Sequence, residues 1–178
     1  RDKLQGVVTT NLDRFLERAS NGEWLETVKP VGDLAQQRGF LWKAHGTLQD
    51  RATWVFARAG YDRVMFGDPQ YKATFGALYR ARTFLFVGCG LLDDDLDLQL
   101  GEARALSGEQ PPPHFALLEG PIGTYRRRSL EDAGIRILTY PKGQHEQVTV
   151  ALHLLGSAPA TAQAPSAAQA PSAAQAPS

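Results

Sequence analysis

The chain has 178 residues, 43% of them hydrophobic and 21% charged, which suits one globular domain with a core of its own. Lys plus Arg and Asp plus Glu both number 19, and this balance gives no electrostatic reason to expect nucleic acid or an anionic membrane as the partner. The single cysteine, Cys89, excludes an internal disulfide framework and a Cys-rich zinc site, so the expected location is a reducing cytoplasm.

The chain then reads as strands that alternate with helices. We predict strands at 6–10, near 24–28, and at 40–44, 53–57, 83–87, 114–118 and 135–140. We predict helices at 12–19, from Pro69 through 79, and at 92–106, 125–133 and 145–155, with Gly134 as a helix stop. The run 83–87 is continuous and apolar, as is typical of a fully buried strand. This alternation predicts an α/β fold with a parallel sheet covered on both faces.

The two ends of the chain carry further expectations. From Ser157 to Ser178 the sequence repeats Ala-Gln-Ala-Pro-Ser-Ala without large apolar residues, which predicts a disordered tail after a folded domain at 1–156. No apolar run approaches the roughly 20 residues that span a bilayer, and no secretory signal opens the chain. A buried-looking strand follows Arg1 almost at once, so we expect a further part of the domain upstream.

The first strand ends abruptly in polar residues, Thr9-Thr10-Asn11-Leu12-Asp13. In one interpretation Asn11 caps the following helix and Asp13 lies favourably at its positive end. In the other, an amide and a carboxylate are held at the carboxyl edge of the sheet, where open α/β folds bind ligands. The two interpretations are compatible.

A second polar strand end is Lys43-Ala44-His45-Gly46, which places an imidazole at the sheet edge beside a glycine that permits close approach of a ligand or backbone. Histidine titrates near neutrality, as a general base must, although a lone histidine is more often structural. The other three histidines lack a carboxylate or cysteine partner at ligand spacing and are interpreted as structural or surface residues: His114, His145 and His153.

Gly88-Cys89-Gly90 follows the strand at 83–87 and precedes three aspartates, Asp93 to Asp95. Glycine-flanked amides before a helix suit a phosphate or a ribose. The aspartates are most simply charge at a helix N-terminus, so we predict no metal site. Cys89 has no histidine spaced to form a nucleophilic dyad.

These three motifs, in this order, resemble the Sir2-like family, and most closely its bacterial branch that lacks the zinc module and occurs in anti-phage defence proteins. Thr10-Asn11-Leu12-Asp13 resembles the family's Asn-x-Asp motif, and Lys43-Ala44-His45-Gly46 resembles its catalytic His-Gly. The run from Val87 to Leu96 resembles its Phe-Val-Gly-Tyr-Ser-x-x-Asp-x-Asp-Leu segment.

The resemblance implies a Rossmann-like fold and NAD as the ligand. Asn11 would position the ribose or the attacking water, Asp13 would hold the nicotinamide carboxamide, and His45 would act as the base. Further cofactor-binding positions implied by the motifs are Thr9, Thr10, Gly46, Gly88, Cys89, Gly90, Asp93 and Asp95. Nicotinamide leaves ribose through an oxocarbenium-like state, for which an amide, a carboxylate and a histidine suffice without a metal.

Three departures separate the chain from the family pattern. The family's first strand and Gly-Ala-Gly phosphate loop are absent and are expected upstream of Arg1. Gly90 stands where the family usually has Ser, and one cysteine cannot form the four-Cys zinc ribbon used in peptide deacylation. The leading hypothesis is an NAD glycohydrolase module, with further domains or subunits of a larger defence or regulatory protein as partners. The alternatives are a non-catalytic NAD or ADP-ribose sensor and a degenerate remnant without ligand binding.

Overall fold

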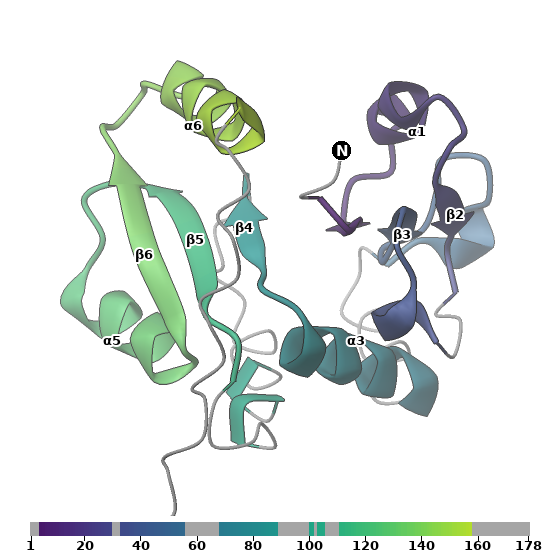
Figure 1. The fold of residues 1–178 in the computed structure, drawn as a ribbon, viewed down its shortest axis with the longest axis horizontal. Coiled ribbons are helices and arrows are strands. Elements are labelled where there is room, and N and C mark those ends of the chain that lie inside the picture. The colour runs from purple at the N-terminus through teal and green to yellow at the C-terminus, as the bar shows by residue number, and fades with distance from the viewer. Residues whose placement is uncertain are drawn as a thin grey trace, which may run out of the picture.

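A computed structural model of the chain describes residues 4–29, 33–55, 68–88, 100–101, 103–105 and 111–157 (Figure 1). The strands are β1 (Gly6–Thr9), β2 (Leu25–Thr27), β3 (Phe40–Lys43), β4 (Leu85–Val87), β5 (His114–Glu119) and β6 (Ile135–Tyr140). The helices are α1 (Phe15–Ser20), α3 (Pro69–Ala81), α5 (Thr124–Asp132) and α6 (Glu146–Ser157). The predicted tail and most of the predicted helix at 92–106 lie outside the described residues, although 100–101 and 103–105 are helical.

Each pair of neighbouring strands among the described residues is parallel, which confirms the predicted α/β, Rossmann-like character. The described strands form two three-stranded sheets where the sequence predicted one, with orders β1-β3-β2 and β4-β5-β6. The middle strand of the first sheet, β3, is buried along its whole length, as expected for a strand paired on both sides.

The prediction that 83–87 is a fully buried strand is wrong. Leu85 of β4 is 36% exposed, and Phe86 and Val87 are only partly buried. The physical reason is that β4 pairs only with β5 among the described strands, so its other edge has no neighbour. A continuous apolar run therefore identified the strand correctly but not its place in the sheet.

The two sheets share one hydrophobic core, and α3 lies between them (Figure 1). This helix begins as predicted, with Pro69 in its first turn and the Asp68 carboxylate accepting hydrogen bonds from the amides of Gln70 and Tyr71 at 3.0 and 3.2 Å. Its buried face packs into a cluster with side chains of β3 and β5. The α3, β3 and β5 members of that cluster are Phe75, Leu78, Tyr79, Phe40, Trp42, Ala116 and Leu118.

No strand forms at 53–55, the described part of the strand predicted at 53–57. Residues Arg51–Thr53 form a 3₁₀ turn, and residues 56–57 lie outside the described residues. Asp50 directs this turn, because its carboxylate accepts from the amide of Ala52 at 3.0 Å and its carbonyl accepts from the Thr53 hydroxyl at 2.6 Å. Such local side-chain bonds compete successfully with strand pairing.

His114 is a core residue, which decides between the structural and surface interpretations that the sequence left open. Its side chain is fully buried at the start of β5, and its ring stacks on Tyr79 with the centroids 3.7 Å apart. Nδ1 accepts a hydrogen bond from the amide of Phe84 at 3.2 Å, so the neutral ring carries its proton on Nε2. Burial, together with the charge of Arg104, lowers the pKa of His114 from 6.5 to about 4.

Because buried His114 resists protonation, we expect the free energy of unfolding to decrease as the pH falls. As the pH falls, the unfolded histidine takes up its proton near pH 6.5, while the folded one stays neutral until about pH 4. Its contribution is therefore complete above pH 6.5 and lost between pH 6.5 and 4, a change of about 3 kcal/mol in the free energy of unfolding. Urea unfolding of the wild type and of His114→Gln across this range measures the difference. Gln retains an acceptor but does not titrate. The free energy of unfolding of this variant should therefore lack the part of the pH dependence that His114 contributes.

His153→Gln is the control, because His153 lies at the surface on α6. This variant should keep the wild-type pH dependence. Equal slopes in the wild type and His114→Gln would contradict the assignment of a neutral, buried His114.

Candidate functional site

The carboxyl ends of β1 and β3 lie side by side. The strands pair in parallel with Thr9 opposite Lys43, and the amide of Ala44 donates to the carbonyl of Thr9 at 2.9 Å. The segments that follow these strands therefore leave the sheet at the same edge. One carries Asn11 and Asp13 and the other carries His45, so the structure brings the first two predicted motifs together.

The segment after β1 is an ordered turn and not the start of a helix. The Thr9 hydroxyl accepts from the amide of Asn11 at 3.1 Å, and the Asp13 carboxylate accepts from the amide of Phe15 at 3.0 Å. Helix α1 begins at Phe15, three residues later than predicted. Asp13 and not Asn11 thus bonds to the amide at the start of the helix, and this leaves Asn11 exposed beside the half-buried Asp13.

The side chain of Lys43, on the neighbouring strand β3, forms hydrogen bonds to the main chain of this turn. This side chain is completely buried, and its ammonium donates to the carbonyl of Leu12 at 3.2 Å, to the carbonyl of Asp13, and to Oε1 of Glu17 at 2.7 Å. A buried ammonium needs such a full set of acceptors and a counter-charge. The sequence interpretation quoted Lys43 in the His-Gly motif but gave it no role, and it did not single out Glu17. The available signal was a lysine at the end of an apolar strand.

The turn after β3 closes on itself and thereby fixes the position of His45. Gly46 has a φ of 93°, and a Cβ atom at this position would collide with the carbonyl and hydroxyl oxygens of Thr53. That hydroxyl accepts from the amide of Thr47 at 3.1 Å, and the amide of Val55 donates to the carbonyl of His45 at 3.3 Å. Gly46 is predicted to permit the close approach of a ligand or of backbone. In the structure, the group that approaches it closely is Thr53 of the same chain. His45 itself is half-buried.

A direct hydrogen bond also joins the two turns. The amide of Leu48 donates to the carbonyl of Leu12 at 3.2 Å, the same carbonyl that Lys43 holds. The turn bearing Asn11 and Asp13 is therefore bonded both to the strand below it and to the turn that bears His45. Together these residues offer a carboxamide, a carboxylate, an imidazole and the hydroxyls of Thr9 and Thr10. We call this group the strand-end cluster.

The third predicted motif is only partly described. Gly88 follows β4 with a φ of 70°, and no described atom lies within 4 Å of the place where its Cβ would be. It stands at the end of the second sheet, and strand pairing does not join it to the first sheet. The other predicted positions of this motif, Cys89, Gly90, Asp93 and Asp95, lie outside the described residues.

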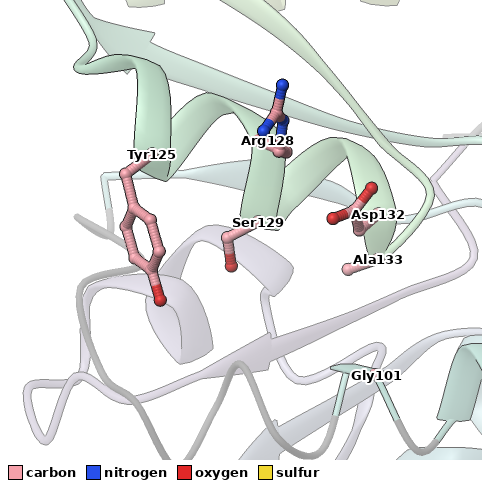
Figure 2. Close-up of a pocket in the computed structure, with 6 residues that line it drawn as sticks. All are labelled: Gly101, Tyr125, Arg128, Ser129, Asp132 and Ala133. Carbon is pink, nitrogen blue, oxygen red and sulfur yellow. The ribbon is translucent and has the colours of Figure 1, made fainter.

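A pocket of about 340 Å³ lies elsewhere, along α5. Figure 2 shows Tyr125 and Ser129 pointing from α5 toward the side where Gly101 lies, with Arg128 pointing the other way. None of the predicted site residues lines this pocket. In the part of the chain that the structure describes, no three His, Cys, Asp or Glu side chains cluster as a metal site would require. No helix in this part is both long and apolar enough to cross a bilayer.

The sequence of the chain is similar to those of known proteins. The chain is 30% identical over 118 residues to the NAD(+) hydrolase ThsA of Bacillus cereus (strain MSX-D12), a match that covers 62% of this chain and 25% of that protein. It is 27% identical over 124 residues to the NAD(+) hydrolase ThsA of Enterococcus faecium, covering 62% of this chain and 24% of that protein. The matched region thus spans about a quarter of the length of these relatives. The model of the SIR2-like domain matches residues 5–138, and the chain therefore belongs to the SIR2-like domain family.

Proposed function

We propose that this domain binds NAD with its nicotinamide and ribose at the strand-end cluster and hydrolyses the bond between them. The observation that carries the proposal is the parallel pairing of Thr9 with Lys43, which delivers Asn11, Asp13 and His45 to one sheet edge. The similarity to two NAD(+) hydrolases supports the same substrate.

The donor set of the cluster suits this reaction. The nicotinamide ring is cationic in NAD and leaves as a neutral base, so positive charge moves onto the ribose as the bond breaks. In the proposal, Asp13 accepts from the nicotinamide carboxamide and Asn11 orients the ribose or a water molecule. His45 takes the proton that the water loses as its oxygen bonds to the ribose carbon. The products are nicotinamide, ADP-ribose and a proton.

The remainder of NAD is proposed to extend toward the end of β4. Gly88 has open space around its Cβ position among the described atoms, as a backbone approached by a ligand requires. In this proposal Gly88, Cys89, Gly90, Asp93 and Asp95 contribute to binding of the second ribose and the phosphates.

The role of the whole protein is a further part of the proposal. Because the relatives extend well beyond the matched region, we propose that the domain works with additional domains or subunits of a larger cytoplasmic protein. An anti-phage defence role is what the family resemblance implies.

The first test replaces the proposed base and the proposed amide. His45→Ala and Asn11→Ala should each lower the rate of nicotinamide release from NAD by about 100-fold or more, the usual scale for loss of a general base or of an oriented polar group. Chromatography of nicotinamide and ADP-ribose measures the rate. His153→Ala, on the exposed face of α6, should leave it unchanged.

Wild-type turnover retained in both His45→Ala and Asn11→Ala would refute the assignment. If calorimetry showed NAD binding to the wild type but no nicotinamide appeared, the domain would be a sensor and not a hydrolase.

The second test separates two duties of Asp13. Asp13→Asn retains an oxygen that can accept from the amide of Phe15 but removes the negative charge. This variant should unfold at nearly the wild-type urea concentration and still lose about 10-fold or more in nicotinamide release. Asp13→Ala should in addition lose about 1 kcal/mol of stability, because the first amide of α1 loses its acceptor. Full activity in Asp13→Asn would limit Asp13 to its structural bond.

The third test moves His45 without replacing it. Gly46→Ala adds a Cβ that collides with Thr53 at a φ of 93°, so it should cost about 1–3 kcal/mol in unfolding free energy and displace the turn. Nicotinamide release should fall with it, even at temperatures where the variant stays folded. Gly143→Ala is the matched control, since Gly143 has a φ of 77° and open space around its Cβ position. It should lose stability but keep its activity, and equal activities in the two variants would contradict the positioning of His45 by this turn.

A further inference from the structure

The buried ammonium of Lys43 donates most of its hydrogen bonds to the main chain of the proposed site. Two of its three acceptors are the carbonyls of Leu12 and Asp13, which belong to the turn that presents Asn11 and Asp13. The third acceptor is Oε1 of Glu17, in the first turn of α1. Lys43 is also two residues before His45 on the same strand end. One side chain is therefore bonded to the Asn11–Asp13 turn while its own backbone leads into the His45 turn.

We propose that Lys43 is a positioning residue that sets the distance and orientation between the Asn11–Asp13 turn and His45. This inference deepens the proposed function and rests on it. Lys43 does not touch the substrate. It acts through the two carbonyls, whose placement fixes the peptide planes on either side of Asp13, and so the direction in which the Asp13 side chain leaves the backbone just after Asn11.

The local backbone supports this role. In a helix that began at Leu12, as the apolar spacing predicts, the carbonyls of Leu12 and Asp13 would accept from amides one turn further along the helix. Here they accept from Lys43, and Leu12 accepts also from Leu48. The ammonium therefore keeps these residues out of the helix and in the turn that carries the proposed catalytic groups.

Removing the charges of Lys43 and Glu17 from water costs free energy that an apolar contact would not cost. Lys43 is 0% exposed and the Glu17 side chain 7%, and Oε2 of Glu17 is buried without a hydrogen-bond partner among the described residues. An apolar pair of similar volume often stabilises a fold as well as such a buried ion pair, or better. The hydrogen bonds from the Lys43 ammonium to the main chain of the turn explain why a charge is present at this buried position.

The test removes the carbonyl anchors without leaving a buried charge. Lys43→Met alone would strand the Glu17 carboxylate and could prevent folding, so the double variant Lys43→Met with Glu17→Leu is the informative one. Arg82→Met is the matched control. Arg82 also donates from a long cationic side chain to a distant carbonyl, that of Ala35 at 2.8 and 3.1 Å, but at the end of α3 and away from the strand-end cluster.

Two readouts are needed. In the double variant, hydrogen exchange at the amides of Asn11, Phe15 and Leu48 should accelerate at least about tenfold, because these amides bond within the turn that Lys43 anchors. The kcat for nicotinamide release should fall by about 30- to 100-fold, while the KM for NAD changes by less than about threefold, as expected when reacting groups are misplaced but the cofactor still binds. Arg82→Met should leave both the exchange of these three amides and kcat unchanged.

A folded double variant with unchanged exchange or unchanged kcat would overturn the proposal and leave Lys43 as an ordinary core ion pair. A wild-type protein that releases no nicotinamide would refute the proposed function instead. The exchange readout would then decide alone whether Lys43 anchors the turn.

Discussion

The parallel pairing of β1 with β3 determines which residues meet at the edge of the first sheet. Because Thr9 lies opposite Lys43, the two strands end together and their following turns share one edge of the sheet. A shift of one residue would turn the side chains of β1 to the opposite face and would also misalign the two turns. Burial of the whole of β3, whose Phe40 and Trp42 pack in the core with α3, makes such a shift expensive. The hydrophobic core thus sets the geometry of the polar edge.

At that edge the same polar groups serve both folding and the proposed chemistry. The Asp13 carboxylate bonds to the first amide of α1, and the Thr9 hydroxyl bonds to the amide of Asn11. The turn of His45 is closed by Thr53, and Lys43 bonds to the carbonyls that separate Asn11 from α1. A site built in this way is preorganised in its backbone, since the two turns that carry the candidate groups are held by bonds to their neighbours before any ligand arrives.

Much of this could be predicted from sequence, because strand ends and polar punctuation are local signals. An apolar run followed by polar residues predicts both the strand β1 and the His-Gly turn. The late start of α1 could not be found this way, because it depends on Lys43, which lies 30 residues from Asp13 in the sequence. Glu17 was missed for the same reason. The apolar run of β4 predicts a buried strand, but such a run does not say whether both edges of the strand are paired.

The proposed function requires that NAD place its nicotinamide and ribose against the two turns that follow β1 and β3. Titration of the ¹⁵N-labelled protein with NAD, followed by amide chemical shifts, tests this most directly. We expect the largest shifts on residues 9–14 and 44–48, with much smaller shifts on α5, whose pocket contains none of the predicted site residues. Shifts concentrated on α5, with residues 9–14 and 44–48 unaffected, would contradict it.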